Sequence, residues 1–92
     1  MPEVHFTLRW PDGTEENCYS PSTAIHQHLS AGTAYPMPDF LTRARAGLNA
    51  ASDRVAAKYG YACSSALDQL ARIEARAATQ PADGQVTCLQ LI

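Results

Sequence analysis

Apolar and polar side chains alternate at the start of the chain. From Val4 to Trp10 every second residue is apolar, which is typical of a strand that buries one face. Pro11-Asp12-Gly13 then forms a turn, because proline presets φ and glycine accepts a positive φ. Thr14 to Tyr19 has the pattern of a returning strand, so this part of the sequence predicts a β-hairpin.

A spacing of three and four residues between apolar side chains predicts a long helix in the middle of the chain. Pro38-Asp39 is a start signal, and Gly60 has the position of a left-handed C-cap. Gly47 costs this helix about 1 kcal/mol relative to Ala, which suggests close backbone packing there. The predicted buried stripe consists of Leu41, Ala44, Leu48, Ala51, Val55 and Tyr59.

Three further elements are expected on either side of that helix. A second long helix begins at Ser64 or Ser65, either of which can cap it. Its predicted inner face consists of Ala66, Leu70, Ile73 and Ala77. A short helix is expected over Thr23 to Leu29, followed by a loop from Thr33 to Met37, and Val86 to Ile92 is strand-like.

The resulting order, β-β-α-α-α-β, predicts one α+β domain over residues 1–92. Its two layers are a small antiparallel sheet, built from the N-terminal β-hairpin plus the C-terminal strand, and a cover of two long helices and one short helix. We expect the last strand to pair with the first. A three-stranded sheet leaves free edges, which favour pairing with another chain.

Composition and charge narrow the class of protein. Of the 92 residues 16 are Ala, and Leu, Ile, Val and Phe together number only 16, so the core is thin and self-association is favoured. The net charge of −2 argues against nucleic-acid binding. No apolar run reaches the ~18 residues of a membrane span and no secretion signal is recognisable, so a cytoplasmic location without membrane contact is expected.

Three widely spaced cysteines argue for reduced thiols instead of a disulfide framework. Cys63 lies at or just before the N-terminus of the second long helix, where free N–H groups and the helix dipole lower a thiol pKa. It is therefore the one candidate catalytic residue, although a small buried side chain in such a turn is the commoner situation. Cys18 and Cys88 fall in strands and are expected to be buried structural thiols.

No metal site or cofactor is predicted. His26 and His28 are two residues apart, so on a helix their side chains point about 200° apart and do not readily share one ion. The sequence contains no CxxC, HExxH, GxGxxG or P-loop motif.

Charged side chains of the first long helix and several aromatic residues are candidates for contact with a partner or a ligand. Asp39 and Arg43 are helix neighbours that can form an ion pair. The charges form either a patch for an anionic partner or a solvated face, and the aromatic residues either close the ends of the core or contribute to a binding surface. The candidate contact residues are Trp10, Tyr19, Arg43, Arg45, Arg54, Lys58 and Tyr61.

Several motifs together resemble one small bacterial family. They are Arg9-Trp10-Pro11-Asp12-Gly13, the segment from Glu16 to Ser22, Asp39-Phe40 with Arg43 and Arg45, and, most specific, the block from Ala51 to Ser64. The chain resembles the nitrogen starvation response proteins, which are encoded in gene clusters with a nitrilase, a radical-SAM protein, an acetyltransferase and a flavoprotein. The resemblance spans nearly the whole chain. It implies a cytosolic role in nitrogen acquisition, linked to nitrile or cyanide assimilation, and it supplies no catalytic residues.

These features predict a small non-enzymatic accessory protein. We expect it to form a homo-oligomer or to bind an enzyme of the same gene cluster, with no cofactor. The alternative is a thiol-dependent enzyme or anionic-ligand sensor centred on Cys63, in which Arg54 or Lys58 stabilises the thiolate. A metal-binding module that combines His5, His26 or His28 with a cysteine is the least supported of the three hypotheses.

Overall fold

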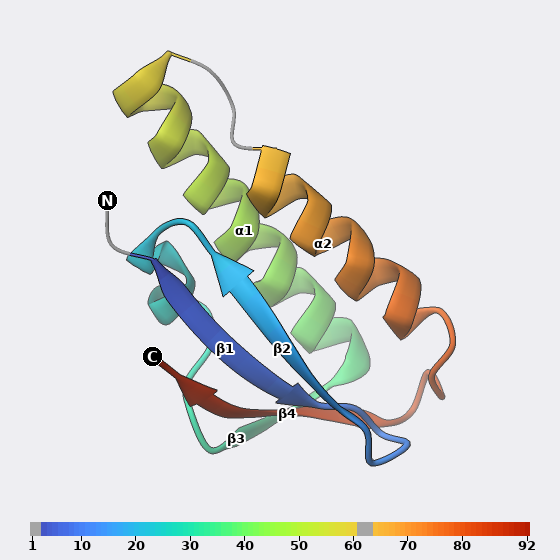
Figure 1. Ribbon diagram of the computed structural model, residues 1–92. Coiled ribbons are helices and arrows are strands. Elements are labelled where there is room, and N and C mark those ends of the chain that lie inside the picture. Colours follow the sequence, from blue (N-terminus) through green and yellow to red (C-terminus); the bar gives the residue numbers. More distant parts are fainter. Residues whose placement is uncertain (1–2, 61–63) are drawn as a thin grey trace.

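The computed structural model describes residues 3–60 and 64–92, and its N-terminal segment forms the predicted β-hairpin. β1 (Val4–Arg9) pairs antiparallel with β2 (Glu15–Ser20), and Gly13 in the turn between them has a φ of 89°. The Gly13 N–H donates to the Trp10 carbonyl oxygen at 2.8 Å, which closes the turn. The other elements are η1 (a 3-10 helix, Thr23–Gln27), β3 (Thr33–Pro36), α1 (Met37–Tyr59), α2 (Ser64–Ala77) and β4 (Gln85–Leu91) (Figure 1).

The strands form one antiparallel sheet in the order β2-β1-β4-β3, and α1 and α2 pack beside each other on one side of it (Figure 1). The α+β class and its two layers are therefore confirmed. The last strand pairs with the first, as expected, since Leu8 of β1 lies opposite Cys88 of β4. Gly60 ends α1 with a φ of 84°, which confirms the predicted left-handed cap.

Two expected elements were wrong. The segment from Thr33 to Met37 is not a loop, because Thr33–Pro36 forms a fourth strand and Met37 begins α1. The expected short helix over Thr23 to Leu29 is a 3-10 helix over Thr23–Gln27, so the helical layer holds two α-helices and a 3-10 turn instead of three helices. Four residues are too few to show a period of two, and β3 exists because it pairs with β4, far along the chain.

One apolar core fills the space between the sheet and α1. Val4, Phe6 and Leu8 of β1 are at most 1% exposed. Trp10 meets Phe40 of α1 edge to face, with ring centroids 5.7 Å apart. The alternation along β1 therefore points every second side chain at α1 and leaves the intervening residues on the outer face of the sheet.

The helices bury most of the predicted stripes, and a few positions differ. Tyr59 is 50% exposed, because the last turn of α1 extends beyond the sheet (Figure 1). On α2 the polar Gln69 is buried in addition to the expected apolar residues, and Leu70 is only partly buried. Leu41 of α1 is also only partly buried. The other predicted positions are buried as expected: Ala44, Leu48, Ala51, Val55, Ala66, Ile73 and Ala77.

Both edges of the sheet are less open than the sequence suggested. His5 of β1 exchanges backbone hydrogen bonds with Ile92, so it does not bond its opposite residue in β2. Bonded and non-bonded positions alternate along an antiparallel pair, so the N–H groups of Glu15, Asn17 and Tyr19 point away from β1. α2 lies along this edge, and Gln69 Oε1 accepts the Tyr19 N–H at 3.1 Å. At the other edge β3 is four residues long and ends at Pro36, which has no N–H to offer.

Candidate functional site

The candidate contact residues of α1 do not form one surface. Arg43 and Arg45 are two positions apart on the helix, so their side chains leave it about 200° apart. Arg43 points toward η1 and β3, whereas Arg45 pairs with Glu74 of α2. Arg54 is exposed, and the Lys58 ammonium lies 5.7 Å from the ring centroid of its neighbour Tyr59.

The other candidate contact residues are also spread apart. Trp10 is only 1% exposed, so of the two roles open to it from the sequence it has the core role and not that of a surface contact. Its indole N–H donates to Glu16 Oε1 at 3.0 Å, which satisfies the one polar group that it buries. Tyr19 lies on β2 with its ring 5.7 Å from the His5 ring. Tyr61 and the candidate nucleophile Cys63 lie outside the described residues, and both remain predictions.

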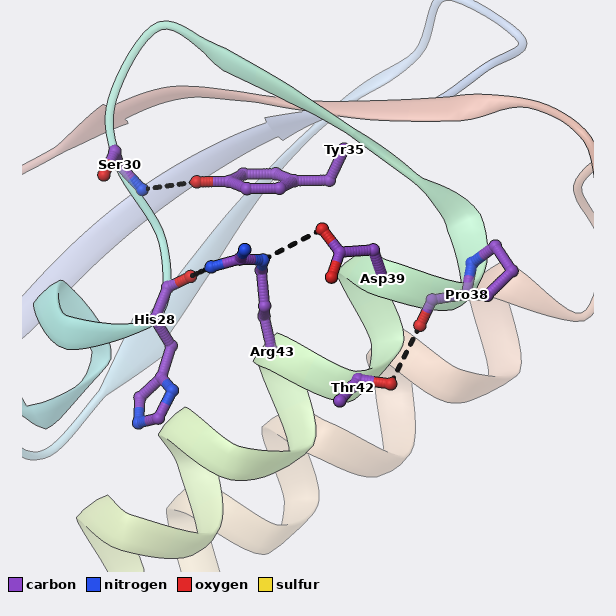
Figure 2. A network of polar contacts seen from close by, with 7 residues as sticks. All are labelled: His28, Ser30, Tyr35, Pro38, Asp39, Thr42 and Arg43. Atoms are coloured by element: carbon purple, nitrogen blue, oxygen red, sulfur yellow. Dashed lines mark hydrogen bonds and ion pairs between the residues drawn. The ribbon is translucent and has the colours of Figure 1, made fainter.

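Arg43 is the centre of a polar network that joins three elements (Figure 2). Its Nε donates to Asp39 Oδ2 at 2.9 Å, which confirms the predicted ion pair within α1. Its Nη1 donates to the His28 carbonyl oxygen at 3.1 Å, and the guanidinium lies 5.0 Å from the Tyr35 ring centroid. The hydrogen bond to Asp39 is the main cause that raises the pKa of Arg43. The network therefore ties the chain after η1, β3 and the start of α1 together.

Tyr35 extends the same network from β3. Its hydroxyl oxygen accepts the Ser30 N–H at 2.9 Å, while its ring is buried next to the guanidinium (Figure 2). Two of the five N–H groups of the Arg43 guanidinium thus donate to protein atoms that hold the segment between η1 and α1 in place, while its side chain stays 43% exposed. These bonds give Arg43 a structural role, and its role in partner contact stays a prediction.

One hollow lined by described residues is a groove between the C-terminal half of α2 and the N-terminal half of α1. This α1–α2 groove has a volume of about 350 Å³. Its polar lining residues are Arg45, Glu74 and Gln80, and Arg45 Nε is 2.6 Å from Glu74 Oε1. Its apolar lining residues are Met37, Leu41, Ala77, Ala78 and Ala82.

The second hollow, the β2–α2 hollow, lies where the first two turns of α2 pass the end of β2. Its volume is about 210 Å³. Apart from Tyr19 of β2 all its lining residues come from α2 and are polar: Ser65, Asp68, Gln69 and Arg72. Ser65 and Asp68 have the spacing of a helix capping box, which is a sequence signal for a helix start and none for a hollow.

The two thiols that the structure describes are buried. Cys18 is 2% exposed and Cys88 is fully buried. Burial raises the pKa of both thiols, and for Cys18 the nearby Glu16 carboxylate adds to the effect. Both cysteines are therefore protonated side chains of the core, as expected from the sequence.

Two further features are absent from residues 3–60 and 64–92. No three or more His, Cys, Asp or Glu side chains among them are grouped as metal ligands. In the same part of the chain neither α1 nor α2 is long and apolar enough to cross a membrane.

Comparison with known proteins gives one match. The family model described as nitrogen starvation-induced protein NitG matches residues 5–91. No curated protein and no solved structure matches the chain. The match begins in β1 and ends in β4, so it includes both hollows and the Arg43 network.

Proposed function

This chain belongs to the family of nitrogen starvation-induced proteins NitG, and we propose that it is a non-enzymatic accessory protein that binds a partner protein in the response to nitrogen limitation. The partner that we propose is an enzyme encoded in the same gene cluster, such as the nitrilase. We propose further that it acts in nitrile or cyanide assimilation in the cytoplasm. The resemblance described above supports the partner class, and the shape of the surface supports binding.

The α1–α2 groove is the observation that carries this proposal. Five of its eight lining residues are apolar, and the other three are polar. Covering the apolar lining with an apolar side chain of a partner gains about 25 cal/mol per Å² of apolar surface removed from water. A hollow that combines apolar surface with polar side chains supports the binding of a partner protein, because protein contact sites join apolar and polar groups in this way.

The ion pair in the groove limits what a partner must supply. Arg45 and Glu74 satisfy each other at 2.6 Å, so a partner does not have to supply a charge to cover the groove. The groove is small enough to take one or two side chains of an amphipathic helix from the partner. Association of two copies through the sheet edges is not favoured, because α2 and Pro36 protect them.

The test is co-expression of the full chain with each enzyme of its gene cluster, followed by native mass spectrometry and a binding titration. Ala78→Arg places a long charged side chain over the groove at an exposed position just after α2, where a cation suits the helix dipole. Ala57→Arg, exposed in the last turns of α1 and outside the groove, is the matched control.

We expect a complex with one cluster enzyme that Ala78→Arg weakens at least tenfold and Ala57→Arg leaves unchanged. Equal weakening by both variants, or the absence of any complex, would contradict the proposal. A homo-oligomer that Ala78→Arg dissociates would replace the enzyme partner with a second copy of this chain.

A further inference from the structure

Two opposite charges in the β2–α2 hollow do not pair with each other. Asp68 and Arg72 are one turn apart on α2, in the order and spacing that favours an ion pair on a helix. The ion pairs within residues 3–60 and 64–92 nevertheless join other residues, and none includes Asp68 or Arg72. A carboxylate and a guanidinium therefore line one hollow, and neither has an ion-pair or hydrogen-bond partner among the described residues.

Gln69 contributes a polar group of a different kind to the same hollow. Its side chain is 8% exposed, and its Oε1 accepts the Tyr19 N–H at 3.1 Å, which fixes the orientation of the amide. Its Nε2 donates no hydrogen bond to any residue of the described chain. In that part of the chain every fully enclosed polar side-chain atom has a hydrogen-bond partner. Since Nε2 has none, it is not fully enclosed and is open to solvent. The helix thus presents a held donor in the same hollow as the two charges.

We propose that the β2–α2 hollow binds the zwitterionic head group of a free α-amino acid. The ligand carboxylate accepts hydrogen bonds from the Arg72 guanidinium and from Gln69 Nε2, and its ammonium donates to the Asp68 carboxylate. The Ser65 hydroxyl, at the start of α2, can serve either group. This site lies at the end of α2 opposite the α1–α2 groove, so it is independent of the proposed protein contact.

Charge and size both favour this class of ligand. A simple anion would leave Asp68 unpaired and a simple amine would leave Arg72 unpaired, whereas a zwitterion satisfies both. The volume of about 210 Å³ corresponds to roughly seven water molecules, which is enough for an amino acid of moderate size. The backbone N–H of Tyr19 is already bonded, so β2 acts as a wall and leaves recognition to α2.

The experiment is an NMR titration of the ¹⁵N-labelled full chain with L-alanine and L-glutamine. Acetate and methylamine serve as probes that carry only one of the two charges. We expect saturable shifts of the Gln69 side-chain amide and of the Tyr19 amide with both amino acids at millimolar concentration. Acetate and methylamine should bind at least tenfold more weakly, because each leaves one protein charge without a partner.

Substitutions test the contribution of each of the two charges by itself. Asp68→Asn and Arg72→Gln are each expected to weaken amino-acid binding at least tenfold, and the exposed Asp53→Asn on α1 is the control that should leave it unchanged. Ala78→Arg should also leave it unchanged, since it blocks only the groove. Acetate that binds as tightly as L-alanine, unchanged binding by Asp68→Asn, or no shift at Gln69 with any probe would each overturn the proposal.

Discussion

Gly47 of α1 lies against Ile25 of η1 so closely that no side chain fits between them. A Cβ atom at Gly47 would be 2.5 Å from Ile25 Cδ1 and 3.5 Å from Ile25 Cα. Ile25 is fully buried, so it has little room to move away. This contact gives the physical reason for a glycine inside a long helix, where it costs about 1 kcal/mol of helix propensity.

The first prediction follows from this contact. Gly47→Ala should destabilise the protein by about 1 kcal/mol, since overpacking of ~1–3 kcal/mol exceeds the gain in helix propensity. Ile25→Val removes the clashing methyl group, so in that background Gly47→Ala should be neutral or stabilising. Urea denaturation of the two single variants and the double variant measures the coupling. Additive effects of the two changes would show that the close approach does not limit position 47.

The second prediction concerns the Arg43 network. Lysine keeps the charge, but it lacks the planar guanidinium with which Arg43 bonds Asp39 and the His28 carbonyl at once. Arg43→Lys should therefore lower the urea midpoint almost as much as Arg43→Ala. Amide exchange at Ser30 should accelerate several-fold, because its acceptor Tyr35 loses its support. Arg54→Ala, at an exposed position of the same helix, is the control, and an equal effect there would contradict the structural role.

The third prediction is a pH dependence that originates in the hairpin turn. The Thr14 hydroxyl, the Thr14 N–H and the Gln80 amide donate to the Asp12 carboxylate and lower its pKa from 3.8 to about 2. A pKa that is lower in the folded state contributes stability that is complete above about pH 4 and is lost as the pH falls toward 2. The stability difference between the wild type and Asp12→Asn should shrink over that window.

This pH dependence is measured by urea denaturation of both proteins between pH 6 and pH 2. A carbon-detected NMR titration of the Asp12 carboxylate gives its pKa directly. A stability difference that stays constant over the whole range, or a carboxylate that titrates near 3.8, would show that the turn hydrogen bonds do not hold Asp12 ionised.

The fourth prediction concerns the buried thiols. In a Cys63→Ser variant, Cys18 and Cys88 should react with a thiol reagent at pH 8 at least a hundredfold more slowly in the folded protein than in urea. Burial raises both pKa values, so almost no thiolate is present, and the reagent has no access to either sulfur. Rapid labelling without denaturant would mean that the sheet opens on the time scale of the reaction.

The fifth prediction addresses the alternative function centred on Cys63. If this cysteine is a nucleophile or part of an anion sensor, its thiol pKa must lie below the usual value of about 8.5. The pH dependence of alkylation in a Cys18→Ala, Cys88→Ala background measures it without interference from the core thiols. A pKa at or above 8.5 would remove this alternative and leave the accessory-protein proposal.

Features that depend on a few neighbouring residues were predictable. The hairpin followed from the alternation between Val4 and Trp10 and from the turn chemistry at Gly13. The Asp39–Arg43 ion pair followed from helical spacing. β3 was missed because a four-residue strand has no periodic signature. For Trp10 the alternation predicted a buried position, while its aromatic side chain also suited a contact surface, and the structure decided for the core.

The sequence by itself determined where most elements begin and end, which face of each is apolar, and which family the chain resembles, because these signals act over short distances along the chain. Only the tertiary structure decided how the surface is assembled. Arg45 meets Glu74 across 29 positions, and Gln69 meets Tyr19 across 50. Both hollows exist because α2 packs against α1 at one end and along the edge of β2 at the other. Such pairings depend on packing between distant segments, which no local pattern records.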